Sequence, residues 1–416
     1  MTNRFQTMPD RIYPMQKDNF GPRLGLAYSP KWLPKTVVRG GFAVMDGQQR
    51  LWEAALFHFQ PPYVNEMFLY NDVPTPSFTA ETLFPSPVTS CCAGVDLTQD
   101  TVYTLNPRKT SKYYEWNFNI QRELPHNFLL QVGYVGTAGR ELPVRYNADQ
   151  ATPFDPNNPT SILSREPYPL IGYIGGNAFT AYSNFNALEI KVERRFAHGF
   201  SITGVYDWQK DLEVATQDED SVFDINHQNW NYGPYYVAQH AVINYIYELP
   251  FGPGKPLLGN AHGALGHLVG GWQFDGITNI QSGNFLTATS DYNNGVGGRA
   301  GNYADVVPGQ NPNNGPHSVA KWFNTAAFAE VPYTRYGDAG QGTIVGPGSV
   351  NFDLSLFKNI KFTESKSLQF RWEMFNAFNH VNLGNPNTDV SAGSSFGTIT
   401  YAGAARIMQF GLKLYF

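Results

Sequence analysis

The segment RIMQFGLKLYF (residues 406–416) decides the fold. Every second residue from Met408 to Phe416 is apolar, whereas Gln409 and Lys413 lie at the positions between them. Successive side chains of a β-strand point to opposite faces, so this segment predicts a strand with one fully apolar face. Chain ends are usually polar and frayed. An apolar final strand therefore indicates that this end lies against an apolar medium.

The same two-residue period recurs along the chain. It predicts about eleven strands of about ten residues each, an all-β fold. The other segments with this period are 20–29, 36–45, 114–121, 128–134, 188–196, 200–208, 241–249, 272–281, 350–362 and 368–374. Ten residues is the length with which a tilted strand crosses a bilayer.

The composition narrows the class of protein. Aromatic and charged residues each make up 15% of the chain, and the net charge is -5. A typical soluble protein has roughly 25% charged residues. No basic run is present, which excludes the electrostatic pattern of a nucleic-acid binder. No apolar run is long enough for a membrane helix, but a barrel strand exposes only every second residue to lipid.

The connections between the predicted strands fall into two alternating sets. Short ones at 30–35, 125–127, 197–199 and 363–367 alternate with long ones at 46–112, 137–183, 209–239, 283–350 and 379–405. Only the connection 250–270 is long where a short one is expected. This division predicts an antiparallel transmembrane β-barrel with short periplasmic turns and long extracellular loops. A soluble β-sandwich, the alternative, has no reason to show it.

Several longer motifs carry a family resemblance. They are YELPFG (247–252), WFNTAAF (322–328), RWEMFNAFNHVNLGNP (371–386) and FGTITYAGAARIMQFGLKLYF (396–416), with NFGPRLGLAYSP (19–30) and KTVVRGGFAV (35–44) near the start. Together they resemble the C-terminal barrel of Oar-like TonB-dependent receptors, which typically carry a carboxypeptidase-regulatory-like domain. The resemblance implies a Gram-negative cell outer-membrane protein, not an enzyme, that imports a large solute such as an oligosaccharide, a peptide or a metal chelate.

The resemblance also implies parts that this sequence does not show. Family members have an export signal, a plug and a barrel like the 22-stranded transporters. We therefore expect residues 1–19 to be a loop or N-terminal remnant and residues 20–416 to form the C-terminal half of such a barrel, a fragment without plug or N-terminal domains. The implied partners are outer-membrane lipid, the barrel assembly machinery and, only through the missing N-terminal parts, the TonB complex. No cofactor and no nucleic acid is expected.

The candidate functional residues form three sets. The first is charged and predicted to face the lumen: Glu189, Lys191, Glu193, Arg371, Glu373 and Lys413. The second is a speculative solute contact on aromatic and Asn-rich loops, where aromatic faces and amide groups suit sugars or peptides: Trp230, Tyr232, Tyr235, Tyr292 and Asn293. The third resembles the C-terminal signal that the assembly machinery recognises: Phe410, Leu412, Leu414 and Phe416.

Several alternatives stay open at this stage. Adjacent Cys91 and Cys92 are two loop thiols or a vicinal disulfide in preference to a redox site. The acidic segment 209–224 is a solvated loop in preference to a calcium site, because its spacing departs from the known loop pattern. The chain could also be a surface adhesion or scaffolding protein that acts through its loops, or a secreted carbohydrate-active enzyme.

Overall fold

The computed structural model describes residues 17, 19–47, 101–103, 109–152, 155, 157–169, 173–214, 220–221, 231–232, 237–290, 303–331, 337–363 and 365–416. Eleven long strands of this part form one sheet. They are β1 (Arg23–Tyr28), β2 (Thr36–Asp46), β4 (Lys112–Leu124), β5 (Phe128–Asn147), β6 (Tyr173–Ala197), β7 (Phe200–Glu213), β10 (Gln239–Glu248), β11 (Trp272–Gln281), β16 (Ser349–Lys361), β17 (Ser367–Phe375) and β18 (Ile407–Tyr415).

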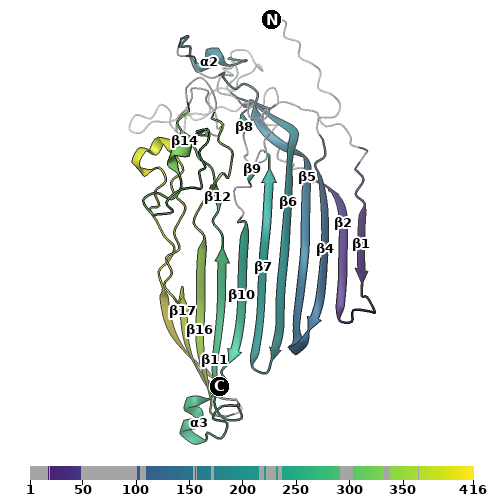
Figure 1. Ribbon diagram of the computed structural model, residues 1–416, viewed down its shortest axis with the longest axis vertical. Coiled ribbons are helices and arrows are strands. Elements are labelled where there is room, and N and C mark those ends of the chain that lie inside the picture. The colour runs from purple at the N-terminus through teal and green to yellow at the C-terminus, as the bar shows by residue number, and fades with distance from the viewer. Residues whose placement is uncertain are drawn as a thin grey trace, which may run out of the picture.

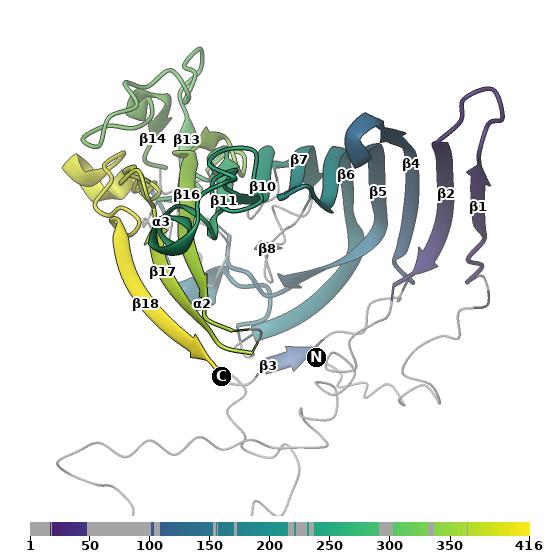
Figure 2. The same cartoon turned by 90° about the horizontal axis from the view of Figure 1, so that it is seen from below.

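Each long strand pairs antiparallel with the next one along the chain, so the order in the sheet is the order in the sequence (Figure 1). The predicted all-β antiparallel fold of about eleven strands is confirmed. Seen along the strands, the sheet curves into an open trough with β1 and β18 at its two edges (Figure 2). Among the described residues, no helix has the length and apolar character needed to cross a membrane.

Three short strands pair with the long ones. β3 (Thr101–Tyr103) and β8 (Asp220–Ser221) pair parallel with β6 and β5, and β9 (Asn231–Tyr232) pairs antiparallel with β7. Two small ladders lie between β11 and β16 in the chain: β12 (Phe285–Leu286) with β15 (Ile344–Val345), and β13 (Asp305–Val306) with β14 (Phe328–Ala329).

The register gives the sheet one apolar and one polar face. Leu356, Trp372 and Phe410 are directly opposite one another on β16, β17 and β18, and so are Ile360, Leu368 and Leu414. The ring of Phe410 stacks on Trp372 at 6.0 Å and on Phe370 at 6.1 Å. Such cross-strand aromatic pairs stabilise the ladder and fix its register. Because the register is continuous, each strand presents its apolar set to the same side.

Short turns collect at one end of the strands (Figure 1). The turn between β6 and β7 has only His198 and Gly199 between the paired residues Ala197 and Phe200. Both have positive φ, 51° and 75°, as the type I′ hairpin turn requires. The 3₁₀ turn Pro125–Asn127 joins β4 to β5 in a similar way. The exception is the connection 250–270, which carries helix α3 (Gly263–Val269).

β5 and β6 are longer than predicted, with 20 and 25 residues. Extensions of these strands therefore take up about half of the expected loop 137–183, and the expected ten-residue strand length is wrong for both. The ladder shifts register twice, between Gly139 and Leu142, where Glu141 has φ 54°, and between Leu142 and Val144. A bulge inverts the alternation of faces beyond it. This inversion hid the continuation of the strand from a search for period two.

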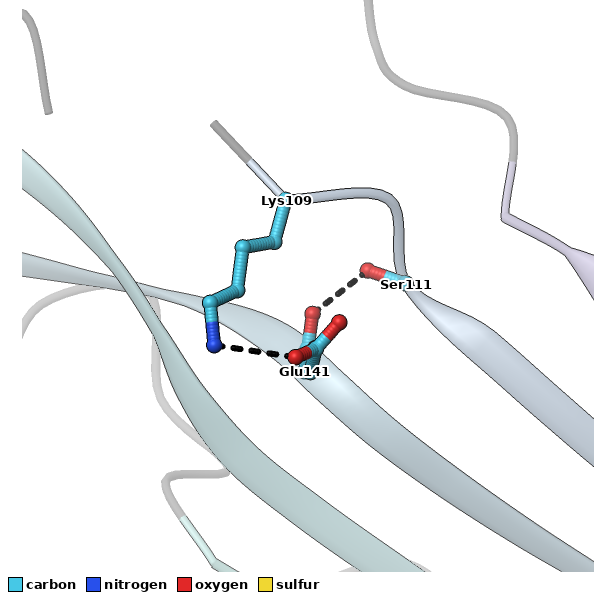
Figure 3. A network of polar contacts seen from close by, with 3 residues as sticks. All are labelled: Lys109, Ser111 and Glu141. Atoms are coloured by element: carbon cyan, nitrogen blue, oxygen red, sulfur yellow. Dashed lines mark hydrogen bonds and ion pairs between the residues drawn. The ribbon is translucent and has the colours of Figure 1, made fainter. Parts of the chain in front are cut away.

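The bulge at Glu141 also fixes the start of β4 (Figure 3). Lys109 Nζ lies 2.9 Å from Glu141 Oε1, and Ser111 Oγ donates to the Glu141 carbonyl at 2.9 Å. The ion pair is largely exposed, so it contributes less than about 1 kcal/mol. Ser111 is buried, and its hydrogen bond holds the incoming chain against β5.

A small hydrophobic core forms at the long-loop end. The motif WFNTAAF supplies its centre: Phe323 is almost fully buried, and its ring meets Phe328 at 6.2 Å and Phe396 at 5.1 Å edge to face. Asn324 caps the 3₁₀ turn Thr325–Ala327 by accepting from the amide of Ala326. Phe396 follows another 3₁₀ turn, Val390–Ser395, so the β11–β16 and β17–β18 loops share one core.

Asparagines of the motif RWEMFNAFNHVNLGNP act as local caps where β17 ends. Asn376 has φ 48°, and its side chain donates to the carbonyls of His380 and Ala404 at 2.9 and 3.1 Å. Its Oδ1 accepts from the amide of His380 at 2.9 Å. Asn379 and Asn382 likewise accept from the amides of Arg406 and Val350. These bonds tie the start of β18 and the start of β16 to the same loop.

We expect Asn376→Ala to lower the free energy of unfolding by about 2–4 kcal/mol. The substitution removes three hydrogen bonds, and it leaves an alanine in the left-handed region, where its Cβ is strained and no side-chain bond compensates. Asn376→Gly is the matched control: it removes the hydrogen bonds but tolerates the positive φ, so about 1 kcal/mol should return. Urea unfolding in lipid vesicles measures both. Two variants as stable as the wild type would contradict this account of the motif.

Candidate functional site: the polar face of the sheet

The polar face is ordered in rows that cross the strands. One row places Ser355, Glu373 and Gln409 opposite one another, and another places Asn359, Gln369 and Lys413 together. The row between them holds Phe357, Arg371 and Gly411. Polar side chains thus predominate on this face of β16, β17 and β18. The register extends this polar face through Asp275 on β11 and Asn244 on β10.

The six charges predicted to face the lumen all lie on this polar face, but in two groups. Glu189, Lys191 and Glu193 belong to β6. Arg371, Glu373 and Lys413 belong to β17 and β18, and four strands separate them from β6. In the first group Lys191 Nζ pairs with Glu193 Oε2 at 2.9 Å within the same strand.

A depression of about 470 Å³ lies on the polar face where β7, β10, β11, β16 and β17 meet. Three carboxylates line it, those of Asp275, Asp353 and Glu373. Thr203 and Asn244 add hydroxyl and amide groups, and Tyr245, Ile246, Ile277, Phe357 and Phe375 give the lining a large apolar part. A concave surface of this mixed kind suits a ligand that has both polar and apolar groups.

The three carboxylates are held by amides. Gln273 Nε2 lies 2.9 Å from both carboxylate oxygens of Asp275, and Gln409 donates to Glu373 Oε2. The backbone amide of Asn376 donates to Asp353 Oδ1 at 2.9 Å. Among the described residues, none of the three has a cation within ion-pair distance. The depression therefore gathers three carboxyl groups with acceptor capacity to spare.

The neighbouring cation Arg371 is directed elsewhere. Its Nε donates to Gln369 Oε1 at 2.6 Å, and its guanidinium lies 5.1 Å from the ring centre of Phe357. Gln369 in turn donates to Asn359 Oδ1 at 2.8 Å. Alternation placed these residues on the polar face, but it gave no sign that amides, and not cations, would hold the carboxylates.

The speculative solute contact cannot be placed. Trp230, Tyr235, Tyr292 and Asn293 lie outside the described residues, as do Cys91 and Cys92. Of Tyr232 only the backbone is described, in β9 opposite Leu212 of β7. Asp211 and Glu213 of the acidic segment belong to β7, and half of that segment lies outside the described part. No group of three or more potential metal ligands occurs among the residues that the structure describes.

Two cations on the apolar face were not predicted. Arg194 of β6 lies opposite Phe128 and Ile202, and Lys358 of β16 lies opposite Trp272 and Phe370. Both are near the short-turn end of their strands. Arg194 donates to the carbonyls of His126 and Phe200, and its guanidinium lies 5.2 Å from the Phe200 ring centre. Each cation lies next to a turn whose backbone carbonyls accept its hydrogen bonds, and the closeness of a turn was the missed signal.

A further pair of carboxylates lies beyond β5, in the segment that leads to helix α2 (Ile162–Arg165) and on to β6. Asp149 is 1% exposed, and its Oδ1 accepts from the amide of Tyr168 at 2.6 Å. Burial raises the pKa of Asp149. Burial, and then the charge of Asp149, raise the pKa of Glu166. Both groups are therefore more easily protonated than free carboxyls.

This pair makes the loop sensitive to pH. A carboxyl whose pKa is raised by folding contributes stability below its unfolded value and loses it as the pH rises through the folded value. We expect hydrogen exchange at the Tyr168 amide, corrected for intrinsic rates, to be slower at pH 4 than at pH 7. Asp149→Asn keeps the acceptor and removes the charge, so it should weaken this dependence. Asp155→Asn, an exposed residue that bonds the amide of Asn157, should leave it unchanged. Equal pH dependence in both variants would contradict the assignment.

The chain can be compared with known proteins by its sequence and by its fold. No curated protein matches the chain. Solved structures with a similar fold include the outer membrane transporter YddB from Escherichia coli, with 9% identity and TM-score 0.46 over 91% of this chain and 38% of that one. The ferripyoverdine receptor of the Pseudomonas aeruginosa outer membrane has 10% identity and TM-score 0.44 over 95% and 32%. The FrpB iron transporter from Neisseria meningitidis has 10% identity and TM-score 0.43 over 95% and 39%.

The chain spans between about a third and two fifths of the length of these structures. A family model described as an outer membrane beta barrel domain matches residues 2–409, nearly the whole chain. The chain therefore belongs to the outer membrane beta barrel domain family and is a protein of the outer membrane.

Proposed function

We propose that this chain is the C-terminal barrel portion of an outer-membrane TonB-dependent receptor that takes up a large solute. The single observation that carries the proposal is the polar face. It holds amide-bonded carboxylates on neighbouring strands of a broad sheet, which suits a wall around a filled, hydrated lumen. These carboxylates keep acceptor positions that groups from outside the sheet can fill.

The strand directions support a larger barrel. β1 and β18 run the same way, because ten antiparallel pairings separate them (Figure 1). Neither this sheet alone nor two copies of it inserted in the same direction can close by antiparallel pairing. An odd number of further strands is required, and eleven would give the 22 of the large transporters. Residues 20–416 are then the second half of the barrel, and residues 1–19 lead into it.

The motifs that resemble Oar-like receptors support the same proposal, since they lie in the barrel and in its loop core. Coupling to TonB would act through N-terminal parts, and the carboxypeptidase-regulatory-like domain belongs to those parts. The lipid-facing row that ends in Phe410, Leu412, Leu414 and Phe416 would be the contact for the barrel assembly machinery. We propose no enzymatic step for the chain.

Deletion of the gene should abolish energy-dependent uptake of one solute class when ferric chelates, oligosaccharides and peptides are tested in parallel. Complementation with Asp275→Asn/Glu373→Gln should restore the protein to the outer membrane but lower uptake severalfold, because both changes keep the acceptors and remove the charge. Unchanged uptake of all three classes in the deletion strain would contradict the proposal.

A surface adhesion role is the second candidate, and the folded core of the long loops favours it. The same deletion strain separates the two roles: loss of cell or surface attachment with normal uptake would support adhesion.

The two faces of the final strand should respond differently to one substitution. Leu412→Lys places a charge on the lipid side and should lower the free energy of unfolding by about 1–4 kcal/mol, depending on its depth. The control Gln409→Lys is three residues away, on the lumenal side of the same strand, directly opposite Glu373. It should lower the free energy of unfolding by less than about 1 kcal/mol. Urea unfolding in vesicles compares them. Equal losses would show that the faces are wrongly assigned.

A further inference from the structure

The connection 250–270 is the one long segment on the short-turn side, and its helix lies against the apolar side of the sheet. The carbonyl of Leu268, in the last turn of α3, accepts from the indole of Trp272 at 3.0 Å and from Lys358 Nζ at 3.1 Å. Trp272 and Lys358 are opposite each other on the apolar face. The end of α3 is therefore fixed to the lipid-facing side of the rim, not to the lumenal side.

Lys358 explains why the helix is held there. A primary amine on a lipid-facing surface lowers the stability of the protein unless its N–H groups find acceptors and its charge is compensated. Lys358 is only 6% exposed, donates to the carbonyls of Leu268 and Gly270, and lies 5.1 Å from the Trp272 ring centre. The last carbonyls of a helix carry partial negative charge, which suits an ammonium group. The amine and the helix end satisfy each other.

The other side of α3 carries apolar side chains with no protein partner to bury them. Gly266 is buried against Pro253 and Ala261. On the opposite side of the helix, Leu265 and Leu268 are 55% and 68% exposed. Leu257 and Leu258, earlier in the same connection, are also exposed. These leucines form an exposed apolar patch, and it continues the apolar face of the barrel wall beyond the strand ends.

We propose that the connection 250–270 is an interfacial lipid anchor. Its leucines enter the headgroup and upper acyl region of the periplasmic leaflet, and Lys358 fixes α3 against the rim. The occupant of the exposed surface is phospholipid, because the surface is continuous with the lipid-facing wall and α3 carries no Asp, Glu, Lys or Arg. The exposed His267 between the two leucines is compatible with the polar headgroup region. Leucines that enter the interface in this way gain the free energy of burying apolar surface.

Depth-dependent quenching tests the proposal on the full gene product purified from outer membranes. In a background with native cysteines, including Cys91 and Cys92, replaced by serine, Leu265→Cys and Leu268→Cys are labelled with a polarity-sensitive fluorophore. The protein is then placed in phosphatidylcholine vesicles that carry a nitroxide at acyl carbon 5. We expect at least a twofold loss of fluorescence at both positions. The control Ser365→Cys, on the neighbouring exposed turn, should lose little and should be quenched by aqueous iodide.

Lys358→Met separates the anchor from the leucines themselves. It should keep the barrel folded, as heat-modifiable migration shows, yet reduce nitroxide quenching at position 268 to the level of the Ser365→Cys control. Strong iodide quenching with no nitroxide quenching at positions 265 and 268 would overturn the lipid anchor. It would leave a periplasmic protein or a second copy as occupant. Unchanged nitroxide quenching in Lys358→Met would overturn the role of the lysine.

Discussion

The structure depends on one constraint: in hydrocarbon every backbone N–H and C=O must bond to another strand. Antiparallel pairing meets this need for every strand between β1 and β18, and the register it imposes decides which side chains meet lipid. A slip by one residue would move Phe410 to the lumen and Gln409 to lipid. The aromatic stack of Phe410 on Trp372 and Phe370, and the bond from Gln409 to Glu373, both oppose that slip. The register of β18 is thus fixed by an aromatic contact on its apolar face and by a hydrogen bond on its polar face.

The same constraint explains what the sequence could predict. Alternation follows directly from the pairing, so the eleven strands, their faces and the side on which short turns lie were all visible in the residues. Features that break the period were not. The bulge at Glu141 inverts the faces and so hid half of the β5–β6 hairpin. Asn376 acts through local hydrogen bonds at a left-handed residue, which leave no periodic signal. The pairing of carboxylates with amides depends on rotamers that only three dimensions fix.

Lys358 and Arg194 show how the apolar face accepts a cation near its rim. Arg194 has several donors on a planar group, so two turn carbonyls and the flanking Phe128 and Phe200 rings are enough. Lys358 concentrates its charge on one nitrogen and is more strongly hydrated. It needs carbonyls brought to it, and the β10–β11 connection is long enough to bring a helix end. An unusual turn and an unusual lysine thus have one physical explanation.

The carboxylates of the polar face need hydrogen-bond donors from the groups that lie against them. A carboxylate offers about four acceptor positions, and the amides at Asp275, Asp353 and Glu373 occupy only some of them. The remaining positions are open to water or to the donor groups of whatever lies against this face. Amides hold each carboxylate in place without an ion pair at contact distance. A wall built in this way is oriented but unsaturated, which is what the uptake role proposed above requires of a surface that releases and rebinds its contacts.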